Sequence, residues 1–131
     1  MNSRKDAREV AFKLIFEYLF SGQKNDLSFE ELSSEFELVS EQDYVSKVYY
    51  GVIDKNQELT EIISQKAIGY KLDRIYKVDK AILLVALYEI LYMKEIPYAV
   101  SINEAVELAK KYSTEKSPSF INGILSKVEK A

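Results

Sequence analysis

Basic side chains gather near the start of the chain, at Arg4, Lys5, Arg8 and Lys13. Arg4 and Arg8 are four residues apart, so on a helix they share one face and are spaced to straddle phosphate groups. The chain has three arginines, and two of them lie in this segment. A solvent-exposed helix end is the alternative interpretation. Cations at a helix N-terminus interact unfavourably with the helix dipole, however. Their presence there therefore favours a role other than helix stability.

A second basic segment lies near the C-terminus, where four lysines accompany one acidic residue, Glu115. The lysines are Lys110, Lys111, Lys116 and Lys127. Phe120 falls within this segment. Aromatic rings beside cations suit single-stranded RNA, whose bases stack on rings while its phosphates meet lysines. The helical spacing of Phe120 is equally compatible with a place in the hydrophobic core, so the sequence leaves both interpretations open.

Enzymatic chemistry has few candidate residues, because the chain contains no histidine and no cysteine. Their absence excludes Ser-His and Cys-His machinery, thiolate zinc sites and the Glu-x-x-His motif of di-iron bundles. Glu104 and Glu107 share a helix face, but Glu104 is better explained as the partner of a helix cap at Ser101. No glycine-rich phosphate loop is present. The sequence therefore predicts no catalytic residue, no metal site and no cofactor.

Charge is distributed unevenly along the chain. The formal net charge is −3, from 18 basic and 21 acidic residues. Residues 25–46 carry seven carboxylates and no lysine or arginine, so the rest of the chain has a formal charge of +4. A basic remainder is compatible with a phosphate backbone as partner. On charge alone, a solvated acidic surface without further meaning is the simpler interpretation.

Hydrophobic periodicity predicts the elements that position these side chains. Apolar residues recur at helical spacing through most of the chain, and no turn-flanked alternating run indicates a strand. Helices are expected over 4–20, about 28–36, from 40 to a break near 56, on to 69, about 79–94, 101–112, and from 117 onward. The expected first residues or caps are Ser3, Ser28, Ser40, Asp79, Ser101 and Ser117. The sequence predicts an all-α chain of about seven helices, organised as a single domain over residues 1–131.

The most apolar run is AILLVALYEILYM, residues 81–93, in which Glu89 is the only charged residue. Because this run is too short to span a bilayer, it predicts a buried helix at the centre of the fold. Glu89 is expected at the edge of this helix or paired with an arginine or lysine. The N-terminus is charged, so no export signal is indicated, and we expect a cytoplasmic protein that does not contact a membrane.

Five segments, taken together, resemble one protein family. They are DAREVAFKLIFEY (6–18), YYGVIDKN (49–56), LDRIYKVDKAILLVALYEI (72–90), IPYAVSINEAVELAKKYS (96–113) and SFINGILSK (119–127). In this order, and across nearly the whole chain, they are similar to the NusB family of transcription antitermination factors. The acidic stretch at 25–43 resembles the family least.

The resemblance implies an all-α fold of two small helical bundles packed together, without catalysis or a cofactor. It further implies binding of boxA RNA together with the ribosomal protein NusE. The heterodimer is expected to join RNA polymerase through other Nus factors and to suppress termination, notably in ribosomal RNA operons. Members of the family differ in self-association, so a homodimer stays open.

The resemblance also implies roles for individual residues. The RNA-binding positions that it carries over are Arg4, Lys5, Arg8, Phe16, Lys116, Ser117 and Phe120. Asp79 matches an acidic residue associated with the RNA and NusE surfaces. Lys80 and Leu84 stand where arginine is common in the family, and Asp6 interrupts the basic run. Each lost cation is expected to weaken phosphate contact and to lower the salt slope of binding by roughly one unit.

Two other functions compete with this interpretation. NusB-like domains also resemble the N-terminal part of a ribosomal RNA cytosine methyltransferase, so the chain could serve as an RNA-binding accessory to a separate modifying enzyme. Alternatively, the chain is a protein-interaction module whose acidic arm and exposed aromatic residues bind NusE, with RNA contact incidental.

Overall fold

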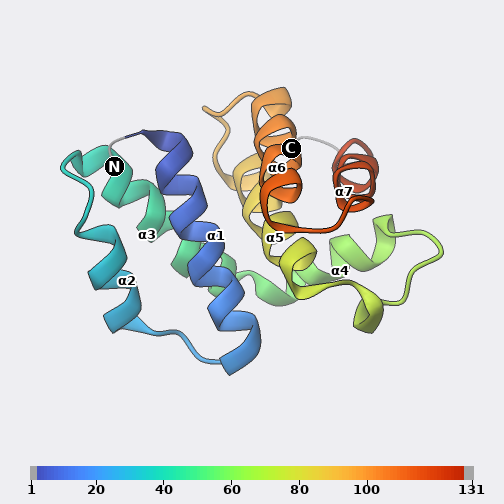
Figure 1. Ribbon diagram of the computed structural model, residues 1–131, viewed down its shortest axis with the longest axis horizontal. Coiled ribbons are helices and arrows are strands. Elements are labelled where there is room, and N and C mark those ends of the chain that lie inside the picture. The colour runs from blue at the N-terminus through green and yellow to red at the C-terminus, as the bar shows by residue number, and fades with distance from the viewer. Residues whose placement is uncertain (1–2, 129–131) are drawn as a thin grey trace.

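The computed structural model describes residues 3–128, and the regular secondary structure in that range is helical (Figure 1). The helices are α1 (Arg4–Ser21), α2 (Asp26–Ser33), α3 (Val39–Asp54), α4 (Asn56–Lys66), the short 3-10 helix η1 (Leu72–Arg74), α5 (Lys77–Tyr92), α6 (Tyr98–Tyr112) and α7 (Ser117–Leu125). Residues 3–128 contain seven α-helices and no strand, so the prediction of an all-α chain is confirmed.

The helices form two groups that meet at α5. Helices α1, α2 and α3 pack against one another in the first group, and α1 and α3 also contact α5. Helices α4, α6 and α7 pack on the remaining sides of α5 in the second group. Figure 1 shows α1–α3 on one side of the molecule and α4, α6 and α7 on the other. The arrangement of two small packed bundles is therefore confirmed.

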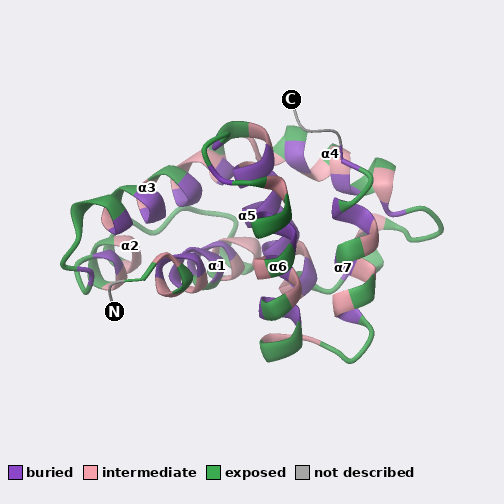
Figure 2. Cartoon of the chain, turned by 90° about the horizontal axis from the view of Figure 1, so that it is seen from above, coloured by how far each residue is buried: buried purple, intermediate pink, exposed green. Residues whose placement is uncertain are grey.

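Helix α5 is the centre of the core because it is apolar on nearly every face. Ten of its 16 residues are buried, and the buried positions continue on the facing sides of α1 and α6 (Figure 2). Leu84 is fully buried here. An arginine at this position was expected to reach phosphate, but the site faces the core, so the leucine removes no surface cation from this chain. No helix within the described residues is long and apolar enough to cross a membrane.

Several helix ends differ from the sequence prediction. The cap at Ser3 is confirmed, because its hydroxyl accepts the backbone N–H of Asp6 at 3.0 Å. The prediction of a cap at Ser101 was wrong: α6 begins three residues earlier, after Pro97, whose φ of −58° already suits a helix. Ser101 therefore lies inside the helix. Likewise α2 is capped by Asn25 rather than Ser28.

Helices α3 and α5 approach closely at Gly51. A Cβ atom at this position would overlap the ring of Tyr88 on α5. The absence of a side chain at Gly51 therefore allows α3 and α5 to pack closely.

Candidate nucleic-acid interface

Arg8 lies inside the molecule rather than on its surface, with a residue exposure of 5%. Its Nε donates to Glu89 Oε2 at 2.7 Å, and a terminal nitrogen donates to Oε1 at 3.2 Å. The other terminal nitrogen donates to Glu104 at 3.2 Å. Burial alone would lower the pKa of Arg8, but the hydrogen bond and the charge of Glu89 outweigh burial, so the net pKa is raised. Arg8 thus joins α1 to both α5 and α6.

Glu89 is fully buried and its carboxylate is saturated with donors. The hydroxyl of Tyr44 on α3 donates to Oε2, and that of Ser101 on α6 donates to Oε1 at 2.8 Å. Burial and the neighbouring Glu89 charge hold the pKa of Tyr44 well above its usual value, so Tyr44 stays a donor. The pairing of Glu89 with an arginine is confirmed. We call Arg8, Tyr44, Glu89, Ser101 and Glu104 the junction network.

Arg4 is also paired with a carboxylate. Its Nε lies 2.6 Å from Oε1 of Glu41 on α3, and its guanidinium lies 4.5 Å from the ring centroid of Tyr44. The hydrogen bond from Arg4 lowers the pKa of Glu41. Lys5 is mainly exposed and lies 3.5 Å from Glu104. The face that Arg4 and Arg8 share is therefore directed at carboxylates of the fold, and an RNA contact by these three residues stays a prediction.

Asp79 and Ser117 lie beneath the surface and organise the segment between α6 and α7. The carboxylate of Asp79 is 3% exposed and accepts the hydroxyl of Ser113 at 2.5 Å and that of Ser117 at 3.0 Å. Ser117 in turn accepts the backbone N–H of Thr114 at 3.3 Å. These bonds hold the turn that carries Lys116 at the surface. Asp79 and Ser117 therefore act as positioning residues for Lys116 in this structure.

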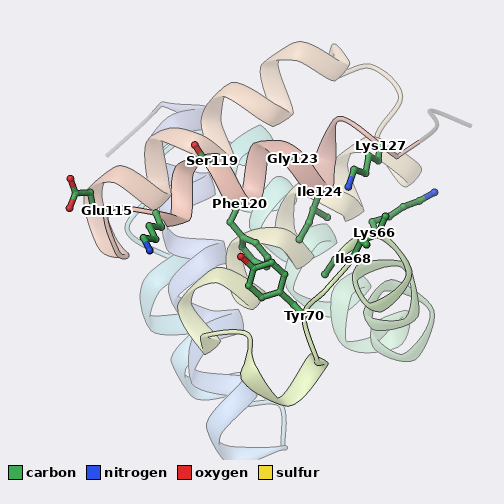
Figure 3. Close-up of a pocket in the computed structure, with 11 residues that line it drawn as sticks. Lys66, Ile68, Tyr70, Glu115, Ser119, Phe120, Gly123, Ile124 and Lys127 are labelled. Carbon is green, nitrogen blue, oxygen red and sulfur yellow. The ribbon is translucent and has the colours of Figure 1, made fainter.

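Phe120 and Lys116 line two adjoining hollows next to that turn. One hollow, of about 530 Å³, lies between the end of α4 and α7. The second, of about 290 Å³, lies between η1 and the start of α7. Both are lined by Tyr70, Lys116 and Phe120. Figure 3 shows the ring of Tyr70 against that of Phe120 within the first hollow.

A third hollow, of about 520 Å³, continues the surface to α1. It shares Tyr76 and Thr114 with the second hollow, and Phe16 and Phe20 line its far side. Phe16 is half-buried and packs edge-on against Phe20, with ring centroids 4.9 Å apart. We call the three connected hollows the aromatic groove. It unites Phe16, Lys116 and Phe120, which are distant in sequence, but not Arg4, Lys5 or Arg8.

The lysines of the C-terminal basic segment divide into two pairs. Lys110 lies 3.5 Å from Glu107, and Lys111 lies 3.0 Å from Glu9 on α1. Lys116 and Lys127 are exposed and, within residues 3–128, form no ion pair with a carboxylate. The cations left available for a phosphate group therefore lie at the aromatic groove rather than along α6.

Sequence reasoning missed three exposed aromatic residues of the groove: Phe20, Tyr70 and Tyr76, which are 65%, 59% and 62% exposed. Tyr70 and Tyr76 lie in the segment YKLDRIYKV, between the helices that were predicted to end at 69 and to begin at about 79. The alternation of tyrosines with basic residues was the available signal. The described residues contain no group of three acidic side chains placed to hold a metal ion.

Known proteins of one family are similar to this chain over nearly its whole length. The model of the NusB family matches residues 5–130. A transcription antitermination protein NusB from Carboxydothermus hydrogenoformans is 46% identical, covering 96% of this chain and 92% of the relative. A protein of the same name from Ruminiclostridium cellulolyticum is 41% identical, covering 97% of this chain and 88% of the relative.

Solved structures are similar over nearly the whole fold. T. maritima NusB superposes with a TM-score of 0.87 at 31% identity, covering 96% of this chain and 90% of that one. A chain from a structure of the antitermination factors NusB and NusE in complex with dsRNA superposes with a TM-score of 0.83 at 26% identity, covering 94% and 92% of the two chains. From the family match, the identity to curated relatives and the shared fold, we conclude that this chain belongs to the NusB family.

Proposed function

We propose that this chain is a non-catalytic transcription antitermination factor, a single NusB-like RNA-binding domain over residues 1–131, of which 3–128 are described. It binds boxA RNA together with NusE in the cytoplasm. The pair joins RNA polymerase through other Nus factors and suppresses termination, notably in ribosomal RNA operons. Membership of the NusB family supports this proposal, as does the similar chain that was solved with NusE and dsRNA.

The aromatic groove is the observation that carries the proposal. Its rings offer stacking surfaces, and Lys116 supplies a cation that no carboxylate within residues 3–128 neutralises. Such a combination binds single-stranded nucleic acid through stacked bases and phosphate contacts. Phe120 and Lys116 contact RNA in this proposal, and Phe16 supplies an aromatic wall at the α1 end.

The remaining residues act differently from one another. Arg4 and Lys5 extend the RNA surface at the start of α1. Arg8 acts indirectly, by fixing α1 against α5 and α6. Asp79 and Ser117 position Lys116 and lie next to the surface that receives NusE.

Fluorescence anisotropy of a labelled boxA RNA against a scrambled RNA tests the proposal. The chain is titrated alone and with equimolar NusE, at two salt concentrations. We expect tight, sequence-selective binding when both proteins are present, with weaker binding by either protein alone. Equal affinity for the two RNAs under every condition would contradict the proposal.

A second candidate is a protein-interaction module in which RNA contact is incidental. One observation favours it: both N-terminal arginines are engaged by carboxylates of the fold. The same titration separates the candidates, because a pure interaction module would bind NusE without raising the RNA affinity of NusE above that of NusE alone.

A further inference from the structure

The hollow between α4 and α7 extends beyond the residues that the resemblance assigns to RNA. Besides Lys116 and Phe120, the hollow is lined by Lys66 and Lys127. Figure 3 shows these last two beyond Phe120, on the side away from Glu115. Its volume of about 530 Å³ lies within the roughly 300–1,000 Å³ typical of pockets that hold small ligands. A single nucleotide is of a suitable size for such a space.

Tyr70 forms a projecting aromatic wall of this hollow. Its ring centroid lies 4.8 Å from that of Phe120 at an interplanar angle of 64°, yet the residue is 59% exposed. Gly69 precedes it with a φ of +86°, a conformation that favours glycine. The backbone N–H of Tyr70 donates to the carbonyl of Ala67 at 3.1 Å. The turn thus holds a large aromatic side chain at the surface, edge-on to a second ring and with much of its own face uncovered.

The charge that surrounds these rings is positive. Lys66, Lys116 and Lys127 line the hollow, against one carboxylate, Glu115. None of the three lysines forms an ion pair within the described part of the chain. Lysines that keep their full charge beside a stacking surface fit a nucleotide phosphate better than they fit an apolar ligand.

Gly123 leaves one side of the hollow open. It lies within α7, where glycine is less favourable than alanine, yet a Cβ atom there would meet no neighbouring atom within 4 Å. Helix packing therefore does not require glycine at this position. Its effect is to leave the surface of α7 free of side-chain atoms next to Phe120.

We propose that this hollow is a nucleotide subsite for single-stranded RNA. An unstacked base lies against the free face of Tyr70, beside Phe120 and over Gly123, while Lys66 and Lys127 contact its flanking phosphates. This inference rests on the proposed function and extends it, because the RNA then continues past Phe120 onto the end of α4 and α7.

An abasic scan of the bound RNA tests the subsite. Single abasic nucleotides are placed along the boxA RNA, and affinity is measured by anisotropy for the full chain with NusE. At one position, removing the base should lower RNA affinity because that base no longer stacks on Tyr70. Tyr70→Ala should weaken binding of the intact RNA about 5- to 100-fold, and it should remove most of the further loss caused by the abasic nucleotide at that position.

Two further variants test the charge and the open face. Lys127→Gln should reduce the salt slope of RNA binding by about 0.7, the value for one phosphate contact on a single strand. Gly123→Leu should fill the hollow and weaken binding without removing a charge. The matched controls lie outside the groove: Tyr92→Ala, Lys47→Gln and Asn122→Leu should leave affinity and slope close to those of the unaltered chain. Thermal melting of each variant verifies that it is folded.

The outcomes separate the subsite from the proposed function. If the unaltered chain with NusE binds boxA selectively and the Tyr70, Lys127 and Gly123 variants behave like their controls, the subsite is wrong and the proposed function stands. If those variants lower affinity for NusE but not for RNA, the hollow belongs to the protein partner, and the subsite is again wrong. If the unaltered chain with NusE shows no selective RNA binding, both proposals fall together.

Discussion

Two regions of this molecule contain the same kinds of side chain and use them in opposite ways. In the junction network, and at Arg4 beside it, arginines meet carboxylates and a tyrosine inside the fold. In the aromatic groove, lysines and aromatic rings lie at the surface, and Lys116 has no carboxylate partner within residues 3–128. In the first region the arginines are paired with carboxylates of the fold, whereas the second has unpaired charge beside a stacking surface.

The contrast shows that the number of cations in a segment does not predict how many of them are available to bind a ligand. The N-terminal segment has the denser basic pattern in the sequence, yet its arginines hold helices together. The C-terminal segment has fewer free cations than its four lysines suggest, but they converge with rings from other helices. Burial and pairing therefore show which cations are available to a ligand, which local charge density does not.

The largest effect should come from removing Arg8. Arg8→Met leaves the fully buried Glu89 carboxylate without its cation, and breaking a buried ion pair from one side costs about 3–5 kcal/mol of unfolding free energy. Urea denaturation at neutral pH measures this loss. The resemblance carries Arg8 over as an RNA-binding residue, which predicts weaker RNA binding when it is removed. The burial of Arg8 predicts instead that its removal mainly lowers the free energy of unfolding.

The double variant Arg8→Met/Glu89→Gln is the control for that experiment. It removes the unpaired charge, and the new amide accepts from one of the hydroxyls of Tyr44 and Ser101 and donates to the oxygen of the other, so most of the lost stability should return. If Arg8→Met is as stable as the unaltered chain, Arg8 does not form the junction network in solution.

A smaller effect is expected at Asp79, which lines the second hollow of the aromatic groove. Asp79→Ala removes the acceptor of the Ser113 and Ser117 hydroxyls, and leaving buried donors unsatisfied costs about 1–3 kcal/mol. RNA affinity should fall as well, because the turn that carries Lys116 loses its anchor. Asp79→Asn keeps one carbonyl acceptor and should retain more of both properties. An unchanged RNA affinity in a measurably destabilised Asp79→Ala protein would contradict the positioning role.

The pair of Arg4 and Glu41 gives a pH-dependent effect of about 1 kcal/mol, since Arg4 is partly exposed. The hydrogen bond from Arg4 lowers the pKa of Glu41 below its usual value of 4.5 in the folded state. The stabilisation is therefore complete above that value and is lost as the pH falls through the lowered pKa. Arg4→Gln should be less stable than the unaltered chain at pH 7, and the difference should shrink by pH 3.

Urea denaturation at both pH values measures this change. Lys5→Gln serves as the comparison, because Lys5 is mainly exposed and its loss should cost no more than about 0.5 kcal/mol at either pH. A stability difference for Arg4→Gln that is equal at pH 7 and pH 3 would show that Glu41 is not its partner.

The smallest effect on stability is expected at Lys116, where function should change instead. Lys116→Gln removes an exposed cation without an ion-pair partner among the described residues, so unfolding free energy should stay within about 0.5 kcal/mol. The salt slope of RNA binding should fall by about 0.7. Lys110→Gln, which removes a lysine already paired with Glu107, should leave the slope unchanged. Equal salt slopes of RNA binding for the two variants would contradict the distinction between lysines with and without an ion-pair partner.

Helix positions were predictable from the sequence because the apolar spacing of a helix is a local property. The stripe in residues 4–20 and the apolar run at 81–93 correspond to α1 and α5. Helix starts were predicted less reliably. Ser101 is of a residue type that is common at helix caps, but it lies inside α6, because Pro97 allows the helix to begin earlier. The position of a cap depends on where the preceding backbone turns away from the helix axis. The spacing of apolar residues does not determine that point.

The candidate site was only partly predictable. Phe120 and Lys116 were identified from the basic C-terminal segment and the resemblance. Tyr70 was not, because the segment around it has no helical period and its ring gains significance only from the neighbouring Phe120.

By itself, the sequence determined the all-α class, the central helix and the family, since each depends on local periodicity or on ordered motifs along the chain. The tertiary structure alone decided which cations are free. Glu89 is 81 residues from Arg8 along the chain, and Glu41 is 37 residues from Arg4. A carboxylate neutralises an arginine only when folding brings the two within hydrogen-bonding distance. Whether a cation is available to a ligand is therefore decided by the folded structure and cannot be read from the number of cations in a segment.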